Sequence, residues 1–219
     1  MMGWHSVRFV VQPCEFGNIT ANSPSKKIAE GLSGGYLTIE LLQKAIILGD
    51  SHAEAHGLLG FLYSMTGQHD EAIAEGEKAV ALNSNSAQCH FLLGKVLTFA
   101  GRWKESIPEY KIAIRPNPIP PITYLYSIGL AYAWTGQYDQ AITWSEKAIR
   151  QEPNSLLAHL FMASVCSQSG RDEEARIEAA EVLRINPKFS LDGFAKSLTY
   201  KKQEDVERQL NALRKAGLK

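Results

Sequence analysis

The chain has 219 residues, of which 45% are hydrophobic and 21% charged, and its 23 basic side chains equal its 23 acidic ones. This composition is typical of a folded domain or a short solenoid, and it excludes a disordered tail, a collagen-like chain and a disulfide scaffold. Because neutralising phosphates requires a basic surplus, we expect no nucleic-acid partner.

The apolar runs and the cysteines indicate the cellular compartment in which we expect the protein. No run approaches the ~20 residues of a membrane span, and residues 1–12 do not make a convincing signal peptide. The three cysteines lack metal-site spacing, and their odd number favours a reducing compartment. We therefore expect a cytoplasmic protein with no membrane contact.

The first fifty residues carry the weakest pattern. Residues 1–18 stay unassigned, although the segment VRFVV could form a short strand. Between Thr38 and Asp50 apolar residues recur at helical spacing. We interpret residues 19–52 as a degenerate copy of the unit that follows.

A unit of about 34 residues then recurs four times. Similar segments (GQHDEA, GRWKES, GQYDQA and GRDEEA) begin at Gly67, Gly101, Gly136 and Gly170. These glycines predict the left-handed residue that ends a helix. A small residue seven positions earlier, which is Gly60, Gly94, Gly129 or Ala163, predicts a close approach of two helices.

Each copy therefore predicts two antiparallel helices joined by a tight turn. The expected ranges of the copies are 53–86, 87–120, 122–155 and 156–189. Pro108 lies inside the second helix of copy two, where we expect a kink or a late helix start.

The repeated positions resemble the tetratricopeptide repeat family. Copy one matches it at Leu59, Gly60, Tyr63, Ala72 and Ala79, and copy three at Gly129, Tyr132, Ala141, Ala148 and Pro153. The resemblance implies an all-α fold, a right-handed α-solenoid of helix-turn-helix repeats. The sequence departs from the family where Trp is common, at His56, His90, Leu125 and His159.

Residues 190–219 predict a C-terminal helical cap. The last helix has an apolar stripe of Val206, Leu210 and Leu213 and is otherwise polar, as the end of a solenoid requires. Residues 36–219 also resemble the arrays found in bacterial class III adenylate and guanylate cyclases and in winged-helix regulators. One open interpretation is therefore a regulatory or self-association fragment of such a signalling protein.

No catalytic constellation is evident, and we expect no enzymatic activity and no cofactor. His52 and His56 have the i, i+4 spacing of metal ligands, but Ala53 stands where the metalloprotease motif needs Glu. Histidines at equivalent positions in three copies favour a structural role, so we predict no metal site. Cys89 and Cys166 are expected to be buried.

The family resemblance implies that the first helices line a concave groove. By position, its lining is Phe61, Phe91, Lys95, Phe99, Tyr126, Leu130, Trp134 and Leu160. In copies two and three these residues recur at i, i+4 and i+8, on one helical face.

Exposed aromatic faces usually mark interaction sites. We therefore expect a protein or peptide partner, with the groove binding an apolar or amphipathic segment and Lys95 taking an acidic group. The alternative is that the groove is filled by the chain's own N-terminal segment or by a second copy, which would make a homo-oligomer.

Overall fold

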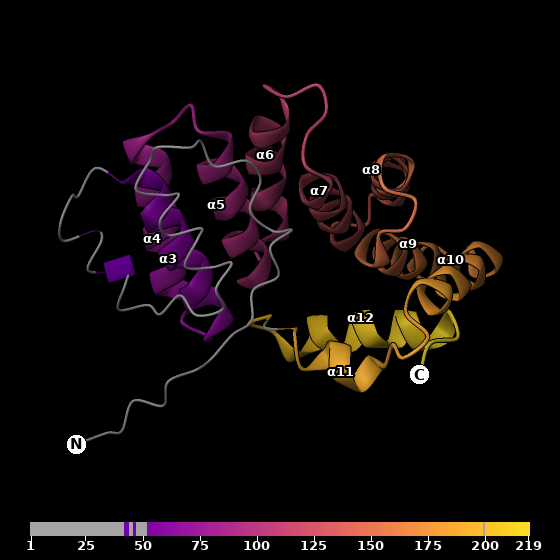
Figure 1. Ribbon diagram of the computed structural model, residues 1–219. Coiled ribbons are helices and arrows are strands. Elements are labelled where there is room, and N and C mark those ends of the chain that lie inside the picture. Colours follow the sequence, from indigo (N-terminus) through magenta and orange to yellow (C-terminus); the bar gives the residue numbers. More distant parts are fainter. Residues whose placement is uncertain (1–41, 44–45, 47–51, 199) are drawn as a thin grey trace, which may run out of the picture.

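Four antiparallel helix pairs follow one another along the chain (Figure 1). The computed structural model describes residues 42–43, 46, 52–198 and 200–219, and no strand occurs among them. The pairs are α3 (Ala53–Met65) with α4 (His69–Leu82), α5 (Ala87–Phe99) with α6 (Trp103–Ile114), α7 (Ile122–Trp134) with α8 (Tyr138–Gln151), and α9 (Leu156–Gln168) with α10 (Asp172–Ile185). The all-α fold predicted from the sequence is confirmed.

Two further helices follow the pairs, the short α11 (Leu191–Ala195) and α12 (Gln203–Lys215). In Figure 1 they lie beneath the α7–α9 region. Within the described residues, no helix is both long enough and apolar enough to cross a membrane.

The turn inside each pair is a glycine C-cap. Gly67, Gly101, Gly136 and Gly170 have φ angles of 80°, 75°, 78° and 81°. In the first turn the Gln68 N–H donates to the Tyr63 carbonyl at 2.9 Å, and the equivalent bond recurs in the other three turns. This is the Schellman arrangement, which satisfies a carbonyl at the helix end and requires the left-handed conformation that glycine adopts without strain.

The helices of a pair approach closely at the predicted small residues. A methyl group added to Gly60 would lie 2.7 Å from the Ala72 carbonyl oxygen. At Gly94 it would lie 2.7 Å from the Tyr110 ring. These distances are below van der Waals contact, so the close approach depends on the missing side chain.

Helix α6 runs through Pro108, so the expected late helix start is wrong, whereas the alternative, a kink at Pro108, stays a prediction. The helix begins at Trp103, where the Ser106 N–H donates to the Arg102 carbonyl at 3.1 Å. The Arg102 Nε also donates to Glu105 Oε1 at 2.7 Å. Since Pro108 lies in the second turn, it removes only one intrahelical hydrogen bond, and the anchored start offsets that loss.

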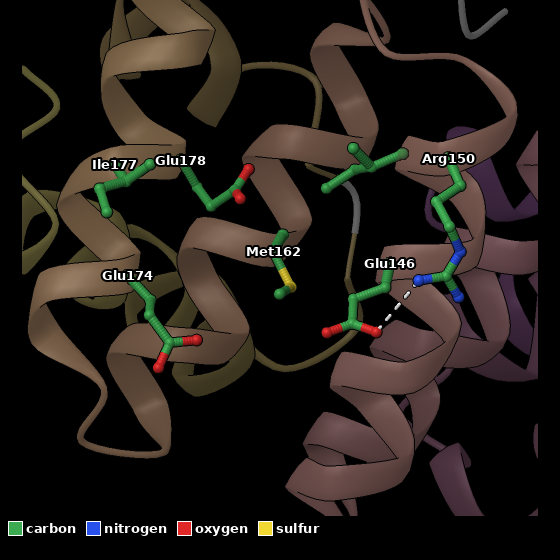
Figure 2. Close-up of a pocket in the computed structure, with 7 residues that line it drawn as sticks. Glu146, Arg150, Met162, Glu174, Ile177 and Glu178 are labelled. Carbon is green, nitrogen blue, oxygen red and sulfur yellow. Dashed lines mark hydrogen bonds and ion pairs between the residues drawn. The ribbon is translucent and has the colours of Figure 1, made fainter.

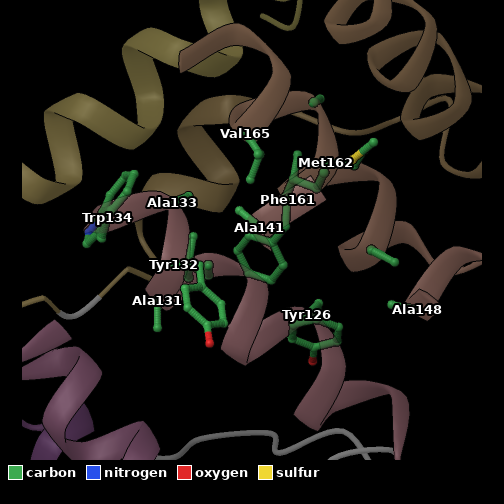
Figure 3. Packing of buried hydrophobic residues seen from close by; sticks show 14 of the residues in the cluster. Tyr126, Ala131, Tyr132, Ala133, Trp134, Ala141, Ala148, Phe161, Met162 and Val165 are labelled. Carbon is green, nitrogen blue, oxygen red and sulfur yellow. The ribbon is translucent and has the colours of Figure 1, made fainter. Parts of the chain in front are cut away.

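One large apolar cluster joins α5 to α12, and two smaller clusters lie around α3 (Figure 3 shows part of the large one). Leu42, fully buried, and the partly buried Ile46 pack against α3 residues such as Leu59 and Phe61. These two belong to the predicted degenerate copy, 19–52, most of which lies outside the described residues, as does the segment 1–18.

Candidate functional site

The eight residues predicted to line the groove lie on α3, α5, α7 and α9, and together we call them the first-helix face. Six of them are 7% exposed or less: Phe61, Phe91, Tyr126, Leu130, Trp134 and Leu160. Lys95 and Phe99 are partly exposed. Most of this face is therefore covered, and the exposed aromatic rings expected from the sequence are largely buried.

Phe61, Lys95 and Phe99 form one group across α3 and α5. The two rings lie 6.1 Å apart. The Lys95 ammonium lies 5.4 Å from the Phe61 ring centre and 5.5 Å from that of Phe99, within cation–π range of both. This group places a cation beside apolar surface at the partly exposed end of the face.

Phe91 and Tyr126 contribute to packing between copies. Phe91 stacks on Tyr124 at 3.9 Å, and Tyr126 lies 5.1 Å from Phe161. The Tyr124 hydroxyl donates to Gln88 Oε1 at 2.8 Å. Burial raises the pKa of Tyr124 to about 12, so the hydroxyl stays protonated as a donor. Phe91 therefore belongs to the core between α5 and α7, while Leu130 and Leu160 belong to the same large cluster.

Trp134 is covered by residues outside the predicted groove lining. Its ring meets Trp103 edge-on at 5.2 Å, and the Arg208 guanidinium lies 4.5 Å above it. Trp103 in turn contacts Tyr200 at 5.3 Å, and its Nε1 donates to Asp205 Oδ2 at 3.2 Å. Figure 3 shows Trp134 at the end of α7, beside the C-terminal helices.

Residues 200–218, which we call the C-terminal strap, cross copies two to four and also reach copy one, where Lys201 pairs with Asp70. The Lys201 N–H donates to the Phe99 carbonyl at 2.8 Å, at the end of α5. Ser164 Oγ in α9 donates to Gln209 Oε1 at 3.1 Å, and Lys215 pairs with Asp172 at 2.7 Å, at the start of α10. Because α12 packs chiefly on α9, it lies along the first-helix face instead of continuing the stack.

The sequence contains a signal for this arrangement that composition alone does not reveal. Gln209 adjoins the apolar stripe of α12 and is fully buried, while the neighbouring Arg208 is exposed. A polar residue at the edge of a buried stripe requires a polar counterpart on the receiving surface. Ser164 is that counterpart, and it stands in the register of the groove-lining residues.

Three histidines of the first helices pair with carboxylates of the second helices. His56 Nδ1 lies 2.5 Å from Glu75 Oε2, His90 Nδ1 lies 2.6 Å from Glu109 Oε2, and His159 Nδ1 lies 2.5 Å from Glu178 Oε2. His52 precedes α3, and its carbonyl accepts from the His56 N–H at 3.2 Å. Of the i, i+4 histidines, His56 thus has a structural side-chain partner in Glu75, and the described residues include no cluster suited to a metal ion.

The other hollow of interest lies on the outer side, between α8 and α10 (Figure 2). Its volume is about 380 Å³ and its floor includes Met162. The carboxylates around it are already paired: Glu146 with Arg150, Glu174 with Arg171, and Glu178 with His159. Charge complementarity is therefore largely satisfied within the chain, and we do not assign this hollow a ligand.

Both described cysteines are buried, as the sequence predicts. Burial raises the pKa of the Cys166 thiol to about 12, which keeps it protonated and unreactive.

Comparisons with known proteins agree with this architecture. Models of the tetratricopeptide repeat match residues 53–86 and residues 135–191. The crystal structure of MamA is 25% identical, with 78% of this chain and 98% of that chain covered at a TM-score of 0.58. YrrB, described as a tetratricopeptide repeat protein with an unusual peptide-binding site, is 24% identical, with coverage of 82% and 92% and a TM-score of 0.57.

A thermophilic tetratricopeptide repeat protein of Thermus thermophilus shares the fold at 20% identity, with 87% of this chain and 95% of that chain covered at a TM-score of 0.62. No curated protein sequence matches the chain. The likeness to cyclase and winged-helix arrays stays a prediction. The repeated pairs, the glycine turns and these matches show that the described chain has the all-α solenoid fold of tetratricopeptide repeat proteins, with residues 53–86 and 135–191 matching the repeat itself.

Proposed function

We propose that this protein is a non-enzymatic interaction module that binds an apolar or amphipathic segment of another protein on its first-helix face. Tetratricopeptide solenoids are generally interaction scaffolds, and YrrB is described as having a peptide-binding site. The proposal extends that role to this chain because aromatic and aliphatic side chains dominate the equivalent helices here.

The observation that carries the proposal is the position of α12. This amphipathic helix rests on α9 and beside Trp134, with Val206, Leu210 and Leu213 buried. A surface that holds one amphipathic helix of its own chain has the shape and polarity to hold another. A preformed receptor surface also lowers the ordering cost of binding.

Lys95 gives the groove a preference that can be tested. It is partly exposed and lies over two rings, so an acidic side chain of the ligand would gain a charge partner next to apolar surface. We expect peptides selected by phage display on the wild-type protein to pair aromatic or aliphatic residues with Asp or Glu. Lys95→Glu should replace that acidic preference with a basic one.

The matched control is Lys104→Glu, which makes the same change on an exposed residue of α6. It should select the same peptides as the wild type. If Lys95→Glu and Lys104→Glu select identical peptides, or if no peptide is selected at all, the proposed groove function is wrong.

Self-association is the second candidate, and the strap is what favours it. A helix that docks on its own solenoid can dock on the same face of a second copy when the connecting residues 196–202 open. Light scattering over a hundredfold range of concentration, which is about 2.7 kcal/mol in association free energy, tests this. A mass that stays monomeric throughout contradicts self-pairing.

A further inference from the structure

We propose that the C-terminal strap is a displaceable occupant of the first-helix face, and that the partner is an amphipathic helix which takes the place of α12. The inference rests on the proposed function and adds the kind of helix that binds and the segment that it must displace.

The stacking contacts between successive helix pairs do not involve the strap. Each pair packs directly on the next: α3 and α4 on α5, α5 and α6 on α7, and α7 and α8 on α9. The strap is outside this series. Its helix α12 packs chiefly on α9 and the short α11, and it reaches other helices through single side chains, such as Arg208 at Trp134, Asp205 at Trp103 and Lys215 at Asp172. Its removal therefore leaves the stacking contacts in place.

The interface beneath the strap is incompletely satisfied. Gln209 is fully buried, and although its Oε1 accepts from Ser164, its Nε2 has no acceptor among the described residues. The indole N–H of Trp134, also buried, lacks one as well. Buried donors without acceptors weaken an interface relative to its apolar area, so a competing helix that supplies an acceptor has an advantage.

The outer attachments of the strap are exposed ion pairs. Lys201 pairs with Asp70 at 2.9 Å, and Lys215 pairs with Asp172 at 2.7 Å. The side chains of both pairs are 40% exposed or more. Ion pairs of this kind contribute little to stability, and salt weakens them further.

The strap itself defines the pattern of the partner helix. Apolar residues occur at i, i+4 and i+7 (Val206, Leu210 and Leu213), and a cation at i+2, Arg208, lies 4.5 Å from the Trp134 ring centre. The partner is accordingly a helix with three apolar residues at this spacing and an Arg or Lys two positions after the first of them.

The test uses the full chain and a labelled peptide of residues 198–219 as the probe. Leu213→Asp places a carboxylate in a fully buried position of the strap and should release it. Because the tethered strap competes at high effective concentration, we expect the variant to bind the peptide at least about tenfold more tightly than the wild type. Leu82→Asp, the same change at a residue that is 44% exposed in α4, should bind like the wild type.

Hydrogen exchange on the same proteins separates the possible failures. In the wild type, amides of 203–215 should exchange faster than those of α7 and α9, and this holds whether or not Leu213→Asp folds well. If these amides are as protected as α9, the strap is not displaceable and the inference is overturned, while the Lys95 test of the proposed function stands. If Leu213→Asp opens the strap and no peptide binds, the assignment of a helix-binding face beneath it is overturned.

Discussion

At the scale of single residues, the histidine–carboxylate pairs replace a contact that the family often makes with Trp. They occur in copies one, two and four, and each joins a first helix to a second helix across nineteen positions. Copy three has Leu125 and Trp144 at the two equivalent positions. Both positions thus change together within one chain, which indicates that the fold needs a filled contact there, either polar or apolar.

We expect a double-mutant cycle on His90→Leu and Glu109→Gln to give a coupling energy of about 1 kcal/mol or more, measured by urea unfolding. The pair is buried at the histidine, which also lies 3.0 Å from the Ser84 carbonyl through Nε2. The control cycle on Glu146 and Arg150, an exposed pair at 3.4 Å, should give less than about 0.5 kcal/mol. Equal coupling in both cycles would contradict a structural role for the buried pair.

Gly94→Ala should lower the free energy of unfolding by about 1–2 kcal/mol, although alanine is the better helix former. The new methyl group would meet the ring of Tyr110, which is fully buried and held by a 2.9 Å hydrogen bond to Thr98. Gly76→Ala is the matched control, because its methyl group would meet the movable end of Leu93 at 3.0 Å. Thermal unfolding should show a loss only for Gly94→Ala, and an equal loss in both would refute this argument.

At the scale of elements, the amphipathic pattern of the strap predicts its helix but not the surface on which the helix packs. The stripe of Val206, Leu210 and Leu213 predicts a helix with one buried side. The structure confirms the helix and the burial of these three residues. The same stripe suits the end of a solenoid and its inner face equally well. Only long-range contacts, such as Asp205 with Trp103, select the surface.

His69, the first residue of α4, lies near Lys201 of the strap and makes the stability of the fold depend on pH. Burial lowers the pKa of His69 below its ordinary 6.5, and the nearby Lys201 lowers it further, while Asp70 opposes the shift. Below pH 6.5 His69 therefore binds more protons in the unfolded chain than in the folded one. Its contribution to the free energy of unfolding is complete above pH 6.5 and is lost as the pH falls towards the pKa of the folded state.

We expect the stability of the wild type to fall more steeply between about pH 7.5 and about pH 5.5 than that of His69→Gln. Urea unfolding of both proteins at both pH values measures the difference, and the other histidines cancel because both proteins contain them. Lys201→Gln, which removes one cause of the lowered pKa, should give an intermediate slope. Parallel pH dependence of His69→Gln and the wild type would contradict the assignment.

At the scale of the whole molecule, the period of the sequence predicts the architecture because each copy contacts chiefly its neighbours. The turn glycines, the close approaches and the helix pairs all follow from local spacing. The state of the first-helix face at Phe99 and Trp134 does not, because residues 200–218 fold back over these two side chains. Trp134 illustrates this, since its position on α7 follows from the repeat and its burial follows from Arg208 and Trp103.

The strap should also make copies two to four open together, because it belongs to the large apolar cluster that joins α5 to α12, whereas α3 lies mainly in two smaller clusters. Leu213→Ala leaves a cavity beneath α12 and should reduce stability by about 2–4 kcal/mol. Native-state hydrogen exchange should show the loss of protection in α7 and α9 and much less in α3 and α4. A uniform loss of protection over all helix pairs would mean that the solenoid unfolds as one cooperative unit. The strap would then not make copies two to four a separate unit.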